Sequence, residues 1–140
     1  MLRGPDAQRN QARLLVWWVL WGSILAGLVV LYLVLVRGKP LPANLPDSTA
    51  LTGLAGVVPL FVSIIIRWLV LPRYTDVRRA LVLFIFGIVL AESCGIVGMF
   101  LGGPYRDELF VLGVLGVAQY MPFFARNYLE PKPRGFIPNN

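Results

Sequence analysis

The chain has 140 residues, of which 57% are hydrophobic and only 14% are charged, with a formal net charge of +6. Because soluble domains have roughly 25% charged residues, this composition predicts a single polytopic membrane domain over residues 1–140. The basic residues end apolar runs and form no cluster with aromatics, so we expect no nucleic-acid partner. The absence of histidine excludes histidine-based metal and haem sites, and the lone Cys94 excludes an internal disulfide.

Four apolar runs predict four transmembrane helices, and hence an all-α, four-helix membrane bundle. The runs are residues 14–36, 51–71, 80–102 and 108–125, and a tail follows at 126–140. The first has 23 uncharged residues, enough to cross a hydrocarbon core of about 30 Å and longer than the apolar part of a signal peptide. In the second run we expect Pro59 to kink the helix; in the fourth, the shortest, Pro122 lies near the end.

The distribution of Lys and Arg predicts the orientation. Nine of them lie in the N-terminal segment, the connection between the second and third runs, and the tail, and Arg67 makes ten on that side. The other side has Arg37, Lys39 and Arg106. The positive-inside rule therefore predicts that both termini are cytoplasmic, in a multi-pass protein of the bacterial inner membrane. We also place Trp17, Trp68 and Tyr128 in an aromatic belt at the inner interface.

Small residues recur along one side of the third run. Gly87, Ala91, Gly95, Gly98 and Gly102 are spaced by three or four residues and fall within an arc of about 80° on a helix. Such a ridge lets two helix backbones approach closely. We therefore expect these five residues to form the helix-packing surface.

Glu92 stands in this otherwise apolar run, about 18 Å from the start of its helix. A charge at mid-membrane costs at least about 2.5–3.5 kcal/mol, so we expect the carboxyl to be mostly neutral in lipid. The same depth in the other runs is marked by small residues or proline, which either pack tightly or leave room for water. Glu92, Ser93 and Ser63 are the candidates for binding an ion; the alternative is a protonated acid that bonds a neighbour.

Two further polar residues lie within the runs. Arg67 is four residues from the end of its run, so it can extend to the cytoplasmic interface or reach inward to Glu92. Gln119 is expected to bond another helix rather than a ligand.

The string "LAESCGIVGMFL" resembles the glutamate helix of the proteolipid c subunits of rotary ATPases. The matching positions are Ala91, Glu92, Ser93, Gly95, Ile96 and Gly98. The resemblance covers one helix, residues 86–103, and implies that Glu92 corresponds to the carboxyl that takes up a proton or Na⁺. The whole chain is similar to small, uncharacterised four-helix membrane proteins of bacteria.

These observations leave two hypotheses for the function. The first is a structural or accessory subunit that packs through its glycine ridge, alone as a homo-oligomer or with other membrane subunits. The alternative is an oligomeric protein that handles protons or cations through Glu92. An enzyme is not expected, because the sequence has no histidine, no GxSxG motif and no paired aspartates. Neither hypothesis requires a cofactor or metal, and both make the lipid bilayer a partner.

Overall fold

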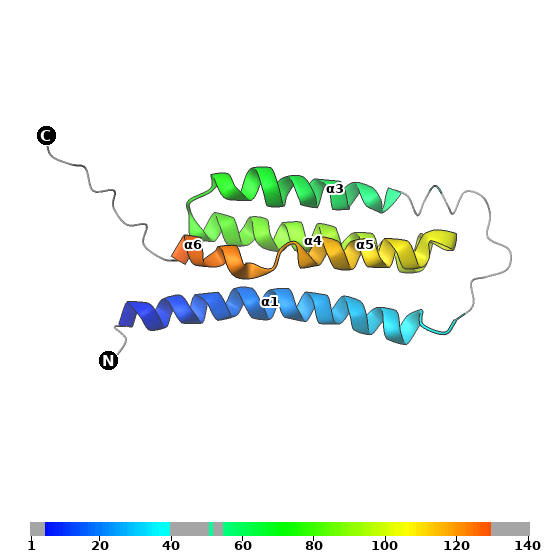
Figure 1. Cartoon of the computed structure of the whole chain (residues 1–140), viewed down its shortest axis with the longest axis horizontal. Helices are drawn as coiled ribbons and strands as arrows, with labels where there is room; N and C mark the ends of the chain where they lie inside the picture. The colour runs from blue at the N-terminus through cyan, green and yellow to red at the C-terminus, as the bar shows by residue number, and fades with distance from the viewer. Residues whose placement is uncertain (1–4, 40–50, 52–54, 130–140) are drawn as a thin grey trace, which may run out of the picture.

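The computed structural model describes residues 5–39, 51 and 55–129 (Figure 1). The described residues form helices and no strands, so the all-α expectation is confirmed for this part of the chain. The predicted tail from residue 130 and the start of the second predicted span at 52–54 lie outside the described residues.

The described helices follow one another along the chain. They are α1 (Pro5–Leu35), α3 (Val57–Ile65), the π-helical η1 (Ile66–Val70), the 3₁₀-helical η2 (Leu71–Arg73), α4 (Val77–Leu101), η3 (Gly103–Tyr105), α5 (Arg106–Ala118), η4 (Pro122–Ala125) and α6 (Arg126–Leu129). Three described segments are long and apolar enough to cross a membrane: Gln8–Leu35, Val77–Leu101 and Gly103–Ala125. This pattern is typical of an integral membrane protein.

Local signals in the sequence explain where the helices begin and turn. The Asp76 carboxylate accepts the backbone N–H of Arg78 at 3.0 Å and caps the start of α4. Gly103, with φ +52°, makes the tight turn from α4 into α5. Pro59 lies in the first turn of α3, three residues after the N-cap Gly56, where its missing N–H leaves no gap inside α3. The helix is interrupted at Gly56, between Ala55 and Val57, and because residues 52–54 lie outside the described residues, the kink expected at Pro59 stays a prediction.

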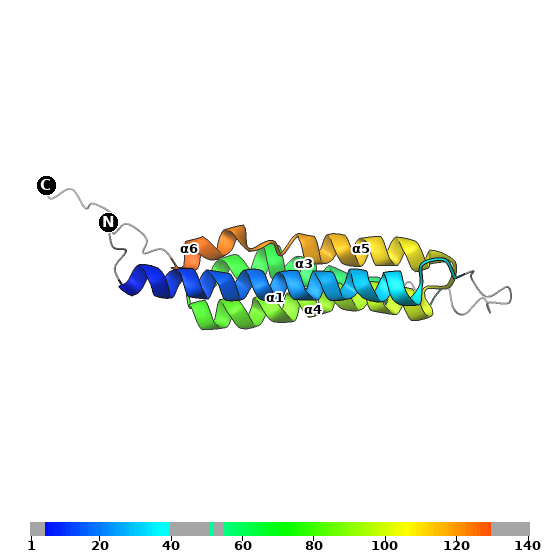
Figure 2. The ribbon, with the colours of Figure 1, turned by 90° about the horizontal axis from the view of Figure 1, so that it is seen from below.

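The α4–α5 pair forms the centre of the bundle. In Figure 1, α1 and α3 lie on opposite sides of this pair, and Figure 2, turned by 90°, separates α4 from α5. Phe84, Ile88 and Ala91 of α4 and Val117 of α5 are fully buried. The outward side chains of α1 and α3, by contrast, are exposed and apolar, including Val19, Val30, Val34 and Phe61. A bundle with this surface is suited to a hydrocarbon environment.

The predicted glycine ridge packs within the chain. A Cβ on Gly113 of α5 would lie 2.6 Å from the backbone nitrogen of Gly95, so the two helices touch through their backbones. One turn away, a Cβ on Gly116 would lie 3.0 Å from that of Ala91. Gly87 faces Tyr120, and Gly98 faces Leu109. All five predicted ridge residues are buried: Gly87, Ala91, Gly95, Gly98 and Gly102.

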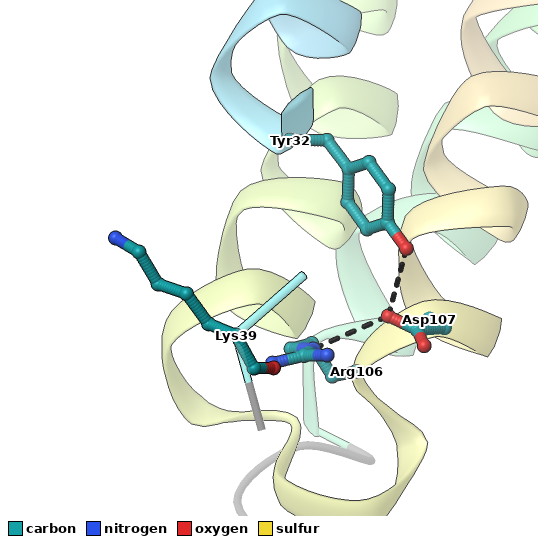
Figure 3. Close-up of polar contacts among 4 residues, drawn as sticks. All are labelled: Tyr32, Lys39, Arg106 and Asp107. Atoms are coloured by element: carbon teal, nitrogen blue, oxygen red, sulfur yellow. Dashed lines mark hydrogen bonds and ion pairs between the residues drawn. The ribbon is translucent and has the colours of Figure 1, made fainter. Parts of the chain in front are cut away.

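At the end of the bundle where α4 turns into α5, polar contacts join α1 to α5 (Figure 3). The Tyr32 hydroxyl donates to the Asp107 carboxylate at 3.0 Å, and Arg106 pairs with the same carboxylate at 3.2 Å. The Tyr32 ring stacks on Phe110, with 3.9 Å between centroids. At the opposite end, Asn10 donates to the carbonyl of Leu129 at 2.9 Å, so α1 is attached to α5 at one end and to α6 at the other.

We predict that Gly95→Leu destabilises the fold by about 3 kcal/mol or more, because a Cβ there would already lie 3.0 Å from Leu28 Cδ1, so a branched side chain has no space between α4 and α1. Thermal unfolding in detergent micelles measures this change. Gly27→Leu in α1 is the matched control, since no atom lies within 4 Å of a Cβ at that position. The control should change stability by no more than about 0.5 kcal/mol. Equal unfolding temperatures for the two variants would contradict the close packing of Gly95 on Leu28.

Candidate functional site: polar groups within the bundle

Glu92 lies beside the α4–α5 contact and not in it. It is half-buried, and no hydrogen bond or ion pair joins it to any other residue in the part of the chain that the structure describes. On the α4 helix it projects about 60° beyond Gly95. Gly95 in turn faces Leu28 of α1, because a Cβ there would lie 3.0 Å from Leu28 Cδ1. Glu92 is therefore on the edge of α4 that turns towards α1.

The three residues expected to bind an ion have separate surroundings. Ser63 is fully buried and donates to the Gly87 carbonyl at 2.7 Å. Ser93 donates to the carbonyl of Leu90 in its own helix, also at 2.7 Å. Both hydroxyls are thus bonded to backbone, and neither is bonded to Glu92. Among the described residues, no group of three acidic, histidine or cysteine side chains is placed to hold a metal ion.

The polar groups converge instead where α5 ends. Pro122 lacks an N–H, so the helix cannot continue, and the backbone carbonyls of its last turn need other donors. Trp21 Nε1 from α1 donates to the Val117 carbonyl at 2.9 Å. Arg67 Nε from η1 donates to the Gln119 carbonyl, also at 2.9 Å. The Val117 carbonyl also accepts the backbone N–H of Tyr120 at 3.0 Å, so Trp21 adds a second hydrogen bond there, whereas Arg67 is the donor that pairs the Gln119 carbonyl.

Arg67 does not bond Glu92. Its guanidinium lies against the break at the end of α5, 4.1 Å from the Phe124 ring centroid and 5.2 Å from that of Trp68. A guanidinium over aromatic faces is favourable in a poorly hydrated site. The contact has a physical cause: a carbonyl within a helical bundle must be paired, and Arg67 is the donor that reaches the Gln119 carbonyl. The extension of Arg67 to the cytoplasmic interface stays a prediction.

Gln119 contributes its side chain as well as its carbonyl. Its Oε1 accepts Trp68 Nε1 at 3.2 Å, so Gln119 does bond another helical segment. Its Nε2 is buried and has no hydrogen-bond partner among the described residues. The break therefore joins α5 to η1 through both the backbone and the side chain of one residue.

Ser63 and Tyr120 form a second connection between helical segments, one helical turn before Arg67. The Tyr120 hydroxyl donates to the Ser63 carbonyl at 2.6 Å, and the Ser63 hydroxyl lies 3.3 Å from it. Tyr120 is fully buried, and its ring end occupies the space that a side chain at Gly87 would need. Gly87 thus has a second role besides helix packing, which is to admit a tyrosine into the bundle.

An aromatic cluster surrounds the break. Trp17 packs on Phe84 with 4.6 Å between ring centroids, on Phe124 at 5.8 Å and on Tyr128 at 6.3 Å. Trp17 is only 1% exposed, so its ring packs inside the bundle, whereas Trp68 is 63% exposed. In α6, outside the spans, Tyr128 donates to the Leu71 carbonyl at 2.7 Å. Burial raises the pKa of Tyr128 while Arg67 lowers it, so the hydroxyl keeps its donor proton at neutral pH.

The sequence reasoning missed Trp21 and Tyr120 as polar partners. The available signal was Pro122, which marks a helix end within an apolar run and hence carbonyls in need of donors. What this arrangement can do chemically is hold helices together, because Trp21, Arg67 and Tyr120 donate to backbone carbonyls of other helical segments. No protein family, no curated protein and no solved structure matches this chain.

We predict that Arg67→Met lowers the free energy of unfolding by about 1–3 kcal/mol, because the Gln119 carbonyl loses its donor in an apolar setting. Chemical or thermal unfolding in the same micelles measures the loss. Arg73→Met is the matched control: Arg73 is exposed and has no partner among the described residues, so its loss should cost less than about 0.5 kcal/mol. An equally mild effect at Arg67 would show that the break is satisfied in another way.

Proposed function

We propose that the protein is a structural or accessory subunit of the bacterial inner membrane, with four transmembrane helices and no catalytic activity. The observation that carries the proposal is the use of the buried polar groups. Trp21, Ser63, Arg67 and Tyr120 each donate to a backbone carbonyl of a different helical segment. Groups engaged in this way brace a scaffold and leave little for binding or turnover.

Besides the three long segments, we propose that the second apolar run also spans the membrane, as the helical run from α3 to η2. It continues from Val57 through the π turn to Arg73, and its outward side chains Phe61, Ile65 and Trp68 are exposed and apolar. An even number of spans is compatible with the contact between Asn10 of α1 and Leu129 of α6, because these residues near the two ends of the described chain lie at the same end of the bundle. With the predominance of Lys and Arg at that end, we propose that both termini are cytoplasmic.

A cysteine-accessibility scan tests this topology. In a Cys94→Ser background, a membrane-impermeant maleimide added outside intact cells should label a cysteine at position 44 and leave one at position 135 unlabelled. Permeabilised cells, in which both should react, are the control. Labelling of position 135 from outside would reverse the orientation, and labelling of both would contradict an even number of spans.

The surface proposed for association is on α1, because the ridge of α4 is already occupied within the chain. Gly22 and Gly27 have no atom within 4 Å of a Cβ position, unlike the ridge glycines. Ser23 and Ala26 beside them are also small, and Ser23, Ala26 and Gly27 are exposed. A helix with small residues on its lipid side permits close approach of another transmembrane helix. We propose a second copy of this chain as that partner.

The second candidate, proton or cation handling, rests on Glu92. A half-buried carboxyl with no partner among the described residues is what a titrating group needs, and the resemblance to the proteolipid glutamate helix points the same way. Against it, Ser63 and Ser93 are bonded elsewhere, so Glu92 has no evident co-ligand in the described bundle.

One pair of variants separates the two functions. In proteoliposomes, the structural function predicts that Gly27→Leu lowers the oligomer mass, measured by native mass spectrometry, without changing the unfolding temperature. It also predicts that vesicles with wild type and vesicles with Glu92→Gln show the same proton and Na⁺ flux as empty vesicles. If Glu92→Gln abolishes a wild-type flux while oligomer mass is unchanged, the protein handles ions. A wild type that is monomeric in lipid would contradict the proposed self-association.

A further inference from the structure

A groove opens between α1 and α4 at the end of the bundle that carries the break. Its volume is about 510 Å³. It is lined by Arg13, Val16, Trp17, Asp76, Val77, Arg78 and Leu81. None of these residues takes part in the contacts at the end of α5 except Trp17, whose ring belongs to the aromatic cluster. The groove is therefore a separate feature of the fold.

Its position matches the boundary between headgroups and hydrocarbon. Arg13 is the last charged residue before the uncharged run of α1, and Arg78 and Arg79 directly precede the apolar run of α4. Two helices thus change from charged to apolar at the same end and on the two walls of one groove. Such a boundary lies at the membrane interface, where lipid phosphates are found.

The charges of the groove favour an anion. Arg13 and Arg78 are exposed, and neither side chain has a partner among the described residues. Asp76, the only acid in the lining, is already engaged: its carboxylate caps α4 at 3.0 Å and lies 3.9 Å from Arg79 Nε. Two unpaired guanidinium groups therefore face one carboxylate that has other partners. Guanidinium binds phosphate well, because its planar donors match two phosphate oxygens.

The rest of the lining is apolar, which selects a lipid over a free phosphate. Val16, Trp17, Val77 and Leu81 make up the remaining walls, and Val16 is 48% exposed. The Trp17 ring is held by Phe84 and cannot turn away. Polar and apolar walls in one groove fit a molecule that has a charged head and a hydrocarbon chain.

From this juxtaposition we propose that the groove between α1 and α4 binds one anionic phospholipid. Arg13 and Arg78 hold the phosphodiester, and the acyl chain lies along Val16 and Leu81. The bound lipid adds contacts between α1 and the central pair, so it stabilises the docking of the first helix.

Native mass spectrometry from nanodiscs of equal phosphatidylglycerol and phosphatidylcholine tests the proposal. Wild type should retain one phosphatidylglycerol in preference to phosphatidylcholine. Each of Arg13→Gln and Arg78→Gln should lower this preference about fivefold, and the double variant about thirtyfold. Arg9→Gln is the matched control, because Arg9 is exposed one turn before Arg13 on α1 but does not line the groove.

Three results would overturn the site. Equal retention of both lipids by wild type would exclude selection of an anion. An effect of Arg9→Gln as large as that of Arg13→Gln would indicate diffuse surface charge. Binding of glycerol phosphate as tight as that of the lipid, measured in phosphatidylcholine nanodiscs, would make this a phosphate site without a lipid. Circular dichroism of each variant checks that the exposed arginines are dispensable for folding, and the single variants provide independent tests.

Discussion

A helix that stops inside an apolar bundle leaves backbone carbonyls that water cannot reach, and this constraint organises the structure around the end of α5. Pro122 stops the helix. The Gln119 carbonyl is then paired by Arg67 from η1, and the Val117 carbonyl, which accepts the Tyr120 N–H, takes a second hydrogen bond from Trp21 of α1. The two donors come from helical segments on different sides of the central pair (Figure 1). The hydrogen bonds at the break therefore tie α1 and η1 to the end of α5.

The close contact between α4 and α5 and the pairing at the break depend on each other. Gly95 and Gly113 bring the two backbones together, and this proximity places Tyr120 against Gly87, where its hydroxyl reaches the Ser63 carbonyl. A side chain at Gly87 would displace the tyrosine and with it the link to α3. Helix packing by small residues and pairing of buried polar groups are here two parts of one arrangement.

The first helix differs from the other three segments in how it is held. Its outward face is largely exposed, and its attachments are concentrated at Trp17, Trp21, Leu28 and Tyr32. Glu92, the groove and the open glycines all lie on or beside this helix. The features that could connect the protein to something else, whether a lipid, a second copy or an ion, thus gather where internal packing is weakest, which is where binding can still add stability.

The sequence by itself determined the helical class, three spans and the buried ridge of α4. Each of these follows from hydropathy, helical period and residue size, which are local properties. It did not place Arg67, Trp17 or Tyr120, and it associated Ser63 with Glu92 although Ser63 bonds Gly87 and Tyr120. Only the tertiary structure decided these partners, because a polar side chain in a bundle bonds whichever unpaired backbone group comes within reach, and that depends on how separate helices pack.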